Sequence, residues 1–357
     1  MSGRPRGMVL VSVLWVMVAM TMAASVFSLW VDQSRTNALE LIASAEYELA
    51  SRSVEAVAIY ARATSIGGPE GVPWPADDQA SRAPMFDSIE DFMSGAPTRS
   101  AQQAGAGAGY LRMDGSVLEV GNARVMIRDR AGLIGLVELN TLAVYESLSS
   151  LGPSAGGGVR LRDTLADYMD EDQLHRLHGA EAPDYLRRGR APPADGVLRS
   201  PLQLRDVLSW DAALAGKHDA WLLDVFRVDG GGFINANTAS QDALELVMPS
   251  PDNAASIVNR RRDRPFRSAV EVGAFAASDG EELLAGIEPA DGIRIWRWQR
   301  GGMTADVDDI QFDALLPGRA AIILNWSSRV ALSETMAERP VEQVDHPLFH
   351  TKNYSLR

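Results

Sequence analysis

The N-terminal part of the chain is dominated by an apolar run that carries no charged side chain over residues 8–31. At about 1.5 Å of rise per residue, an α-helix of this length spans the roughly 30 Å hydrocarbon layer of a membrane. The charged side chains before the run are Arg4 and Arg6, and basic flanks favour the cytoplasmic side. We therefore expect a cytoplasmic leader at residues 1–7, a membrane helix at residues 8–31 and the bulk of the chain on the far side.

A cleaved secretory signal peptide is the alternative interpretation of this run, because the small residues Ala23, Ala24 and Ser25 could form a cleavage site. The run is longer than the 7–15-residue apolar core that is usual in signal peptides. It also continues without a turn signal into a second segment of helical periodicity. One helix that crosses both segments is therefore the favoured interpretation.

The second segment, residues 32–65, repeats apolar side chains at helical spacing. These are Leu39, Ile42, Ala43, Ala50, Val54, Val57 and Ala58. The sequence predicts that the helix ends near residue 64, because Gly67, Gly68 and Pro69 supply a stop signal. We expect the apolar stripe of this segment to pack on a sheet formed by later residues.

Composition excludes several classes of function. A net charge of -13 argues against a general nucleic-acid-binding surface, which needs a basic face. The absence of cysteine excludes disulfides and thiolate metal sites. We find no catalytic serine arrangement, no Gly-rich phosphate loop and no zinc-like spacing of histidines, so we do not expect an enzyme. The histidines are His175, His178, His218, His346 and His350.

The remaining chain changes pattern from strands to helices and back. Residues 66–108 predict a long connection with a short helix at 86–93. Three short strand-like runs then follow, and the pairs Asp114-Gly115 and Gly121-Asn122 between them are typical of hairpin turns. Short helices follow, and strands return at the end. The strand-like runs are 109–113, 116–120, 123–128, 292–299 and 320–326.

This order predicts an α+β fold in which the long N-terminal helix packs on a small antiparallel sheet. The expected head comprises residues 66–137 and 287–357. A large all-α domain at residues 138–286 is expected to be inserted between the strands.

The expected insertion contains a weak internal repeat. Leu139-Asn140-Thr141 and Ala236-Asn237-Thr238 each precede a Leu-rich helical segment, and we expect the Asn or Thr to cap that helix.

The order of these features resembles the type IV pilin-like proteins, and within them the minor pseudopilin K of type II secretion systems. The segments that carry this resemblance are LNT, LADYMDEDQLHRLHGAEAPDYL, LRSPLQLRDV and FINANTAS. The resemblance covers the N-terminal helix and residues 123–275. It implies a protein of the inner membrane with a single membrane span, most of it periplasmic, that takes part in protein secretion as part of a pseudopilus.

Processing by a prepilin peptidase is a further implication of the resemblance. Cleavage after Gly7 makes Met8 the first mature residue, and the family also implies methylation. A Glu is usual at the fifth mature position of pilin-like subunits, where this chain has Ser12. Since Ser cannot supply a charge, the resemblance implies a cap at the pseudopilus tip, in complex with two smaller pseudopilins. We expect residues 39–58 to contact them.

Carboxylates cluster in the expected insertion at Asp167, Asp170, Asp172, Glu181 and Asp184. Oxygen-rich loops of this kind bind hard cations such as Ca²⁺, although an acidic helix end with solvated carboxylates gives the same pattern. The resemblance implies calcium. The chain departs from the family pattern at Gln173, at Leu174-His175 and at Ala182-Pro183, so one ligand is expected to be missing.

Residues 233–275 resemble a helix-hairpin-helix module and support an alternative function, a membrane-anchored DNA-binding protein of a DNA-uptake machine. The hairpin sequence PSPDN has no Gly to let backbone amides approach phosphate. We therefore expect the basic cluster that follows to be a solvated helix face, and nucleic acid to be an improbable partner. The cluster is Arg260, Arg261, Arg262, Arg264 and Arg267.

Overall fold

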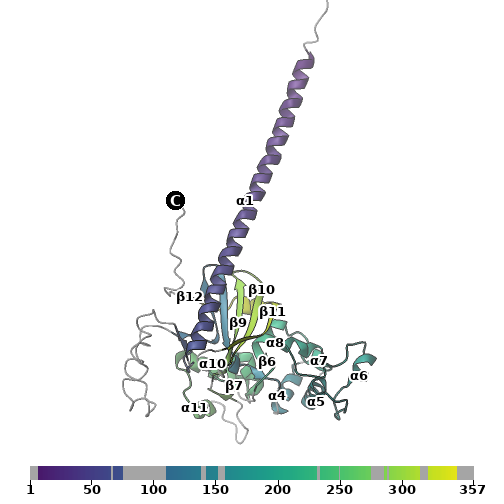
Figure 1. Cartoon of the computed structure of the whole chain (residues 1–357), viewed down its shortest axis with the longest axis vertical. Helices are drawn as coiled ribbons and strands as arrows, with labels where there is room; N and C mark the ends of the chain where they lie inside the picture. Colours follow the sequence, from purple (N-terminus) through teal and green to yellow (C-terminus); the bar gives the residue numbers. More distant parts are fainter. Residues whose placement is uncertain are drawn as a thin grey trace, which may run out of the picture.

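One long helix projects from a head made of a sheet and many short helices (Figure 1). The computed structural model describes residues 7–65, 67–74, 110–137, 142–151, 157–230, 234–248, 250–274, 285–287, 289–313 and 321–343. The long helix is α1 (Gly7–Thr64), so the predicted continuity and the predicted end are both confirmed. Its apolar window is long enough to cross a membrane and has no residue buried inside the protein. The helix expected at 86–93 lies outside the described residues.

Six strands form the main sheet, and neighbours are antiparallel except at one edge. This confirms the predicted α+β class with a small sheet. The exception is β12, which runs parallel to β3 because the chain leaves the opposite edge at the end of β11 and crosses the sheet through α12 (Glu334–Ala337). In spatial order the strands are β11 (Ala321–Ala331), β10 (Thr304–Asp313), β9 (Gly292–Gln299), β4 (Ala123–Asp129), β3 (Asp114–Val120) and β12 (Val341–Gln343).

Of the two predicted hairpin turns, one is confirmed and one is wrong. Gly121 and Asn122 connect β3 to β4, whose first pair is Val120 with Ala123. Asp114 instead begins β3, and Gly115 lies at φ +85° in an irregularity of that strand. The Asp114 carboxylate accepts hydrogen bonds from the backbone and hydroxyl of Ser116, so the Asp-Gly pair forms a bulge within the strand.

A separate two-stranded ladder lies beside this bulge. Strand β2 (Tyr110–Leu111) pairs with β1 (Val72–Pro73), the strand that follows α1. The segment before Asp114 is therefore tied to the end of the long helix and not to β3.

Both faces of the sheet are covered. On one face, Val54, Ala58 and Ala61 of α1 pack with side chains such as Val125 and Ile295. This confirms the predicted packing for the C-terminal part of the apolar stripe, whereas Leu39 and Ile42 of the same stripe are exposed. It also contradicts the expectation that all of residues 39–58 contact other subunits, because Val54 and Ala58 are buried in this chain's own core.

The opposite face of the sheet carries the helical insert. Ala220 and Leu223 of α8 (Asp219–Val225) pack with Trp296, Trp298 and Val307 of the central strands. A β-sheet with both faces covered buries side chains of both alternations, which explains why nearly all of β9 is buried.

The insert runs from the end of β4 to the start of β9 and has a hydrophobic core of its own around Tyr185, Trp210, Phe226 and Phe266. Its helices are α4 (Leu142–Ser149), α5 (Gly158–Met169), α6 (Ala182–Arg187), α7 (Trp210–Ala213), α8, α9 (Gln241–Val247), α10 (Pro251–Asp263) and α11 (Ala269–Gly273). The short 3-10 helices η1 (Arg130–Gly132) and η2 (Pro201–Arg205) accompany them.

The expectation of an all-α insert needs a correction, because two parallel strand pairs close it. Strand β5 (Ile134–Gly135) pairs with β6 (Phe226–Arg227), and β7 (Ile234–Asn235) pairs with β8 (Ala285–Gly286). Each pair satisfies backbone groups where the chain enters or leaves the helical block, and two-residue strands give no periodic sequence signal.

The repeat in the insert does not cap its helix as predicted. Ser240 is the N-cap of α9, and its hydroxyl accepts a hydrogen bond from the Ala243 backbone N–H. Asn237 instead bonds the backbone of Phe266 with both ends of its amide. Asn140 and Thr141 of the first copy lie outside the described residues.

Buried ion pairs join the insert to the sheet. The Arg128 Nε of β4 lies 2.7 Å from Asp224 Oδ1 of α8, and Arg339 Nη2 lies 3.0 Å from Asp224 Oδ2. Although burial opposes ionisation, the guanidinium groups of Arg128 and Arg339 lower the pKa of Asp224. Arg294 and Arg130 bind Asp309 in a second buried set.

We predict that Asp224→Ala lowers the free energy of unfolding by about 3–5 kcal/mol, because it leaves two guanidinium groups without their buried partner. Urea unfolding of the full chain in detergent measures the change. Asp219→Ala on the same helix is the matched control, since it removes a half-exposed pair with Arg205 and should cost less than about 1 kcal/mol. Equal losses in the two variants would contradict the assigned role of Asp224.

Candidate metal centre

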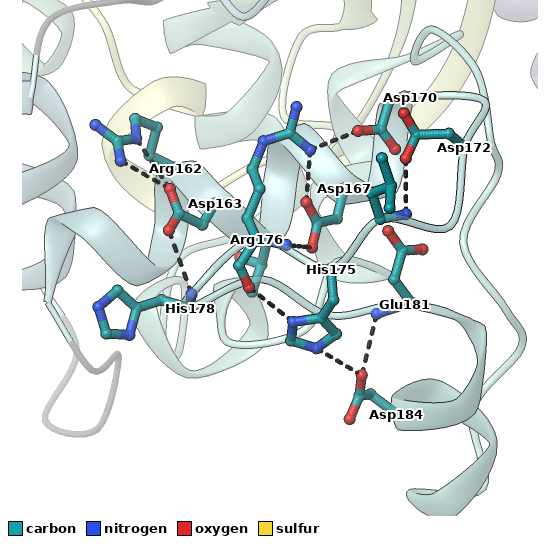
Figure 2. Close-up of polar contacts among 12 residues, drawn as sticks. Arg162, Asp163, Asp167, Asp170, Asp172, His175, Arg176, His178, Glu181 and Asp184 are labelled. Atoms are coloured by element: carbon teal, nitrogen blue, oxygen red, sulfur yellow. Dashed lines mark hydrogen bonds and ion pairs between the residues drawn. The ribbon is translucent and has the colours of Figure 1, made fainter.

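The carboxylate cluster lies on the end of α5, the loop after it and the start of α6 (Figure 2). Helix α5 ends at Met169 with Asp170 as its C-cap residue. Helix α6 begins after Glu181, with Pro183 in its first turn, where a missing backbone N–H costs nothing. The loop between them folds back, so residues from its two ends meet.

Three of the five predicted carboxylates converge. Asp170, Asp172 and Glu181 each offer an oxygen atom, and these atoms lie within 4.8 Å of one another. Glu181 is only 3% exposed. Both of its carboxylate oxygens and Asp170 Oδ1 are buried without a hydrogen-bond partner in the described part of the chain. Since buried polar groups are normally bonded, these oxygens have room for a further partner, and either a water molecule or a cation would satisfy them.

Asp167 is brought near this group but is held by other contacts. It is fully buried, and its carboxylate accepts hydrogen bonds from the Arg176 backbone N–H at 3.2 Å and from Arg176 Nη1 at 2.6 Å. A Cβ at Gly179 would lie 1.8 Å from Asp167 Oδ2, so this close approach of the loop backbone requires glycine.

Arg176 is the residue of this site that the sequence interpretation missed. Its guanidinium lies between Asp167 and Asp170 and bonds both carboxylates (Figure 2). Hydrogen bonds to Asp170 and Asp167 raise the pKa of Arg176. A lone basic residue within an acidic segment was the available signal, because clustered carboxylates need a counter-charge. The arginine neutralises part of the cluster and leaves the side of Asp172 and Glu181 open to a cation.

Asp184 has a structural role in the capping of α6. Its Oδ2 accepts a hydrogen bond from the Glu181 backbone N–H at 3.1 Å, and His175 Nε2 lies 3.0 Å from the same oxygen. Although burial acts in the opposite direction, these bonds lower the pKa of Asp184. The carboxylate therefore stands apart from the convergent three, as Figure 2 shows.

The electrostatics of Glu181 follow from its position. Burial, followed by the nearby Asp167 and Asp170, raises the pKa of this carboxyl from 4.5 to about 7. A bound dication would have the opposite effect, because it favours the ionised form. The three carboxylates fit a hard cation in ligand type, and backbone carbonyls or water would have to complete the six to eight oxygens that calcium takes.

The basic cluster in the helix-hairpin-helix-like segment does not form one surface. Arg261 is buried, Arg260 lies over the Phe266 ring at 5.3 Å, and Arg267 pairs with Glu70 at 3.2 Å. The hairpin residues Ser250 and Pro251 begin α10 as N-cap and first-turn residue. This arrangement gives no continuous track for a phosphate backbone.

No protein-family profile matches the sequence, and no curated protein matches it. Among solved structures, the chain is similar to a chain in the GspK-GspI-GspJ complex of the type 2 secretion system from enterotoxigenic Escherichia coli. The two share 14% sequence identity with a TM-score of 0.48. The alignment covers 84% of this chain and 100% of that chain.

We predict that the free energy of unfolding of the metal-free protein falls as the pH rises from 4.5 to about 7, because Glu181 holds its proton more tightly in the folded chain than in the unfolded chain. The unfolded chain releases this proton near pH 4.5 and the folded chain near pH 7, so the folded state binds more protons between these values. The free energy of unfolding therefore decreases with pH over that range. Glu181→Gln should abolish the decrease and be more stable than the unmodified chain above pH 7.

Urea unfolding in buffer that contains a chelator, at pH values below 4.5 and above 7, measures this effect. Glu171→Gln removes an exposed carboxylate of the same loop and controls for net charge. Parallel pH profiles for the Glu181→Gln variant and the unmodified chain would contradict the prediction.

Proposed function

We propose that this chain is a minor pseudopilin of a type II protein secretion system, anchored in the inner membrane with its head in the periplasm. The observation that carries the proposal is the division of α1 into two parts. Its N-terminal part is apolar and unburied, while its C-terminal part packs on the sheet. Such a helix suits a subunit that is extracted from the membrane into a filament, because the same apolar surface can exchange lipid for neighbouring helices.

We further propose that the subunit caps the tip of the pseudopilus and helps to initiate its assembly. Ser12 stands where a pilin-like subunit usually carries Glu, and a hydroxyl cannot neutralise the α-amino group of a neighbour inside the membrane. Helix α8 of the insert also packs on the central strands of the sheet, on the face opposite α1. A subunit stacked above the head would have to displace this helical block.

Two smaller pseudopilins are the proposed partners, and the surface proposed for them is the exposed part of α1. Leu39, Leu41, Ile42 and Leu49 are exposed, with Leu39 at 57%. They lie between the membrane segment and the part of α1 that packs on the sheet. Clusters of exposed apolar side chains on one helix are typical of contacts with other helices.

The acidic loop is proposed to bind calcium through Asp170, Asp172 and Glu181, with Asp167 and Asp184 as supporting residues. The support comes from the convergence of the three carboxylates and from the orphaned oxygens of Glu181. Calcium bound there would neutralise repulsion between like charges and tie the start of α6 to the end of α5.

We predict that mature protein begins at Met8, because Gly7 matches the site of a prepilin peptidase at the edge of the membrane run. N-terminal sequencing of protein from membranes tests this. Gly7→Leu should keep the leader attached, whereas Gly3→Leu in the same leader should be processed normally. A mature chain that begins near Val26 would instead support a cleaved signal peptide.

We predict that chelation lowers the melting temperature and that added calcium restores it. Calcium at one hundred times its dissociation constant stabilises the folded state by about 2.7 kcal/mol. Asp172→Asn should remove most of this response, while Glu171→Gln should retain it. A melting temperature that is indifferent to both chelator and calcium would contradict the calcium proposal alone.

The proposed assembly role is tested on isolated pseudopili with a gold-labelled tag on the C-terminus. We predict label at one end of each filament, with a tagged shaft subunit as the periodic control. A periodic distribution of this chain would contradict the tip position. Absence of the chain from pseudopili, with unchanged secretion after its removal, would contradict the pseudopilin role itself.

A further inference from the structure

A cavity of about 280 Å³ lies where the head meets the insert. One wall comes from the segment after α1 and from the start of β3. The other wall comes from Asn237 and from the C-terminal end of α10. Arginine side chains from both walls line the cavity, namely Arg112 from the head and Arg261 and Arg262 from α10.

Arg261 is the central feature of this cavity. It is only 7% exposed, and its Nη1 donates a hydrogen bond to the Ala236 backbone carbonyl at 2.8 Å. Among the described residues, no Asp or Glu forms an ion pair with it. Burial lowers the pKa of Arg261 to about 10. The nearby Asp114 carboxylate acts in the opposite direction, while Arg128, Arg112 and Arg262 act in the same direction as burial. A buried guanidinium without a carboxylate partner is costly, so an anion in the cavity would relieve this cost.

The carboxylates that line the cavity already have other partners. Asp114 Oδ2 lies 2.6 Å from Arg112 Nη2, and the other oxygen of Asp114 accepts hydrogen bonds from Ser116. Glu70 lies 3.2 Å from Arg267, which is outside the cavity. Asp114 acts on Arg261 through space without forming an ion pair with it. The guanidinium groups of Arg261 and Arg262 are in no ion pair in the described part of the chain, so both can bind an anion in the cavity. This positive site stands out in a chain whose net charge is -13.

The walls of the cavity are fixed before any ligand arrives. A Cβ at Gly71 would lie 2.4 Å from the Leu111 carbonyl oxygen, and Gly71 has a φ of +123°, so only glycine suits this wall. On the other wall, Asn237 donates to the Phe266 carbonyl at 2.9 Å and accepts from the Phe266 backbone N–H at 2.8 Å. Pre-organised donors lose little entropy on binding, which favours a specific ligand.

We propose that this cavity is a binding site for a small oxyanion, a carboxylate or a phosphate, held by Arg261 and Arg262 with Arg112 at the rim. The planar fork of a guanidinium matches both anions with paired N–H···O bonds. A nucleic-acid duplex fits the observations less well, because Arg260 and Arg267 of the same cluster are engaged with Phe266 and Glu70. The site is independent of the calcium loop and of the proposed role in secretion.

Isothermal titration calorimetry of the full chain in detergent micelles tests the proposal. Sodium phosphate and sodium succinate are the probes, and sodium chloride at equal ionic strength is the reference. The protein is first treated with a chelator and then dialysed into calcium-free buffer without chelator, so that neither calcium nor the chelator's carboxylates contribute. We expect saturable binding of at least one probe, and the stronger of the two identifies the ligand class. Heat no greater than that of chloride for both probes would overturn the proposal.

Arg262→Gln is the informative variant, because this exposed side chain can be changed without disturbing the core. Loss of one charge-assisted contact should weaken binding about tenfold. Arg264→Gln is the matched control, since it removes an exposed arginine near the end of the same helix but outside the cavity. If the Arg262→Gln variant and the unmodified chain bind the probe anion with equal affinity, the anion binds elsewhere and the proposed site is wrong. A gel shift of duplex DNA that Arg262→Gln abolishes would instead favour nucleic acid.

Discussion

The structure depends on buried pairs of arginine and aspartate that hold the helical insert on the sheet. Arg128 of β4 and Arg294 of β9 lie on the face of the sheet that α8 covers, and both are almost fully buried. Arg294 reaches past Asp309 to the backbone carbonyl of Phe226, where the insert's own strand β6 begins. Apolar packing of Ala220 and Leu223 brings α8 onto the sheet, and the buried charges add a constraint, because a shift of α8 would leave Arg128 and Asp224 buried without each other. The pairs therefore fix where the whole insert stands.

The same principle operates on the other face, where the long helix meets the sheet. Small side chains of α1 such as Ala58 and Ala61 let the helix approach the strands closely. Glu55 of α1 adds a polar anchor, because Arg297 of β9 lies 3.3 Å from it and also binds Asp308. The contacts of α1 with the head extend as far as Ala43, whose backbone carbonyl accepts a hydrogen bond from the Asn122 side chain at 2.8 Å. The apolar window nearer the N-terminus has no buried residue. The C-terminal end of α1 therefore forms part of a hydrophobic core, while its N-terminal part has an exposed apolar surface.

The two candidate binding sites are the acidic loop of the insert and the cavity between the insert and the head. They have opposite charge, but each contains a buried ionisable side chain. At the acidic loop, three carboxylates converge and Glu181 lacks a hydrogen-bond partner for either oxygen. At the cavity beside α10, Arg261 is buried without a carboxylate of its own. Other charged groups at both sites form ion pairs with each other. Arg176 pairs with Asp167 at the loop, and Arg112 pairs with Asp114 at the cavity. In each place one buried ionisable group, Glu181 or Arg261, forms no ion pair in the described part of the chain. The two proposed ligands would supply the opposite charge there.

Features that depend on neighbouring residues could be predicted before the fold was known. The uncharged run and the helical spacing after it predicted α1 to its last turn, and Gly121-Asn122 predicted the β3–β4 hairpin. Strand β10 escaped prediction because Asp306, Asp308 and Asp309 give it a polar appearance, and only pairing with arginines of other strands makes it a central strand. Likewise, the acidic cluster was visible in the sequence, but its division was decided by the fold. Asp167 is hydrogen-bonded to Arg176, and Asp184 is hydrogen-bonded to the backbone at the start of α6. The loop places Glu181 beside Asp170 and Asp172. These outcomes rest on the path of the loop between α5 and α6 and on the pairing of the strands. Both decide which of several nearby side chains meet, and no periodic pattern in the sequence specifies that choice.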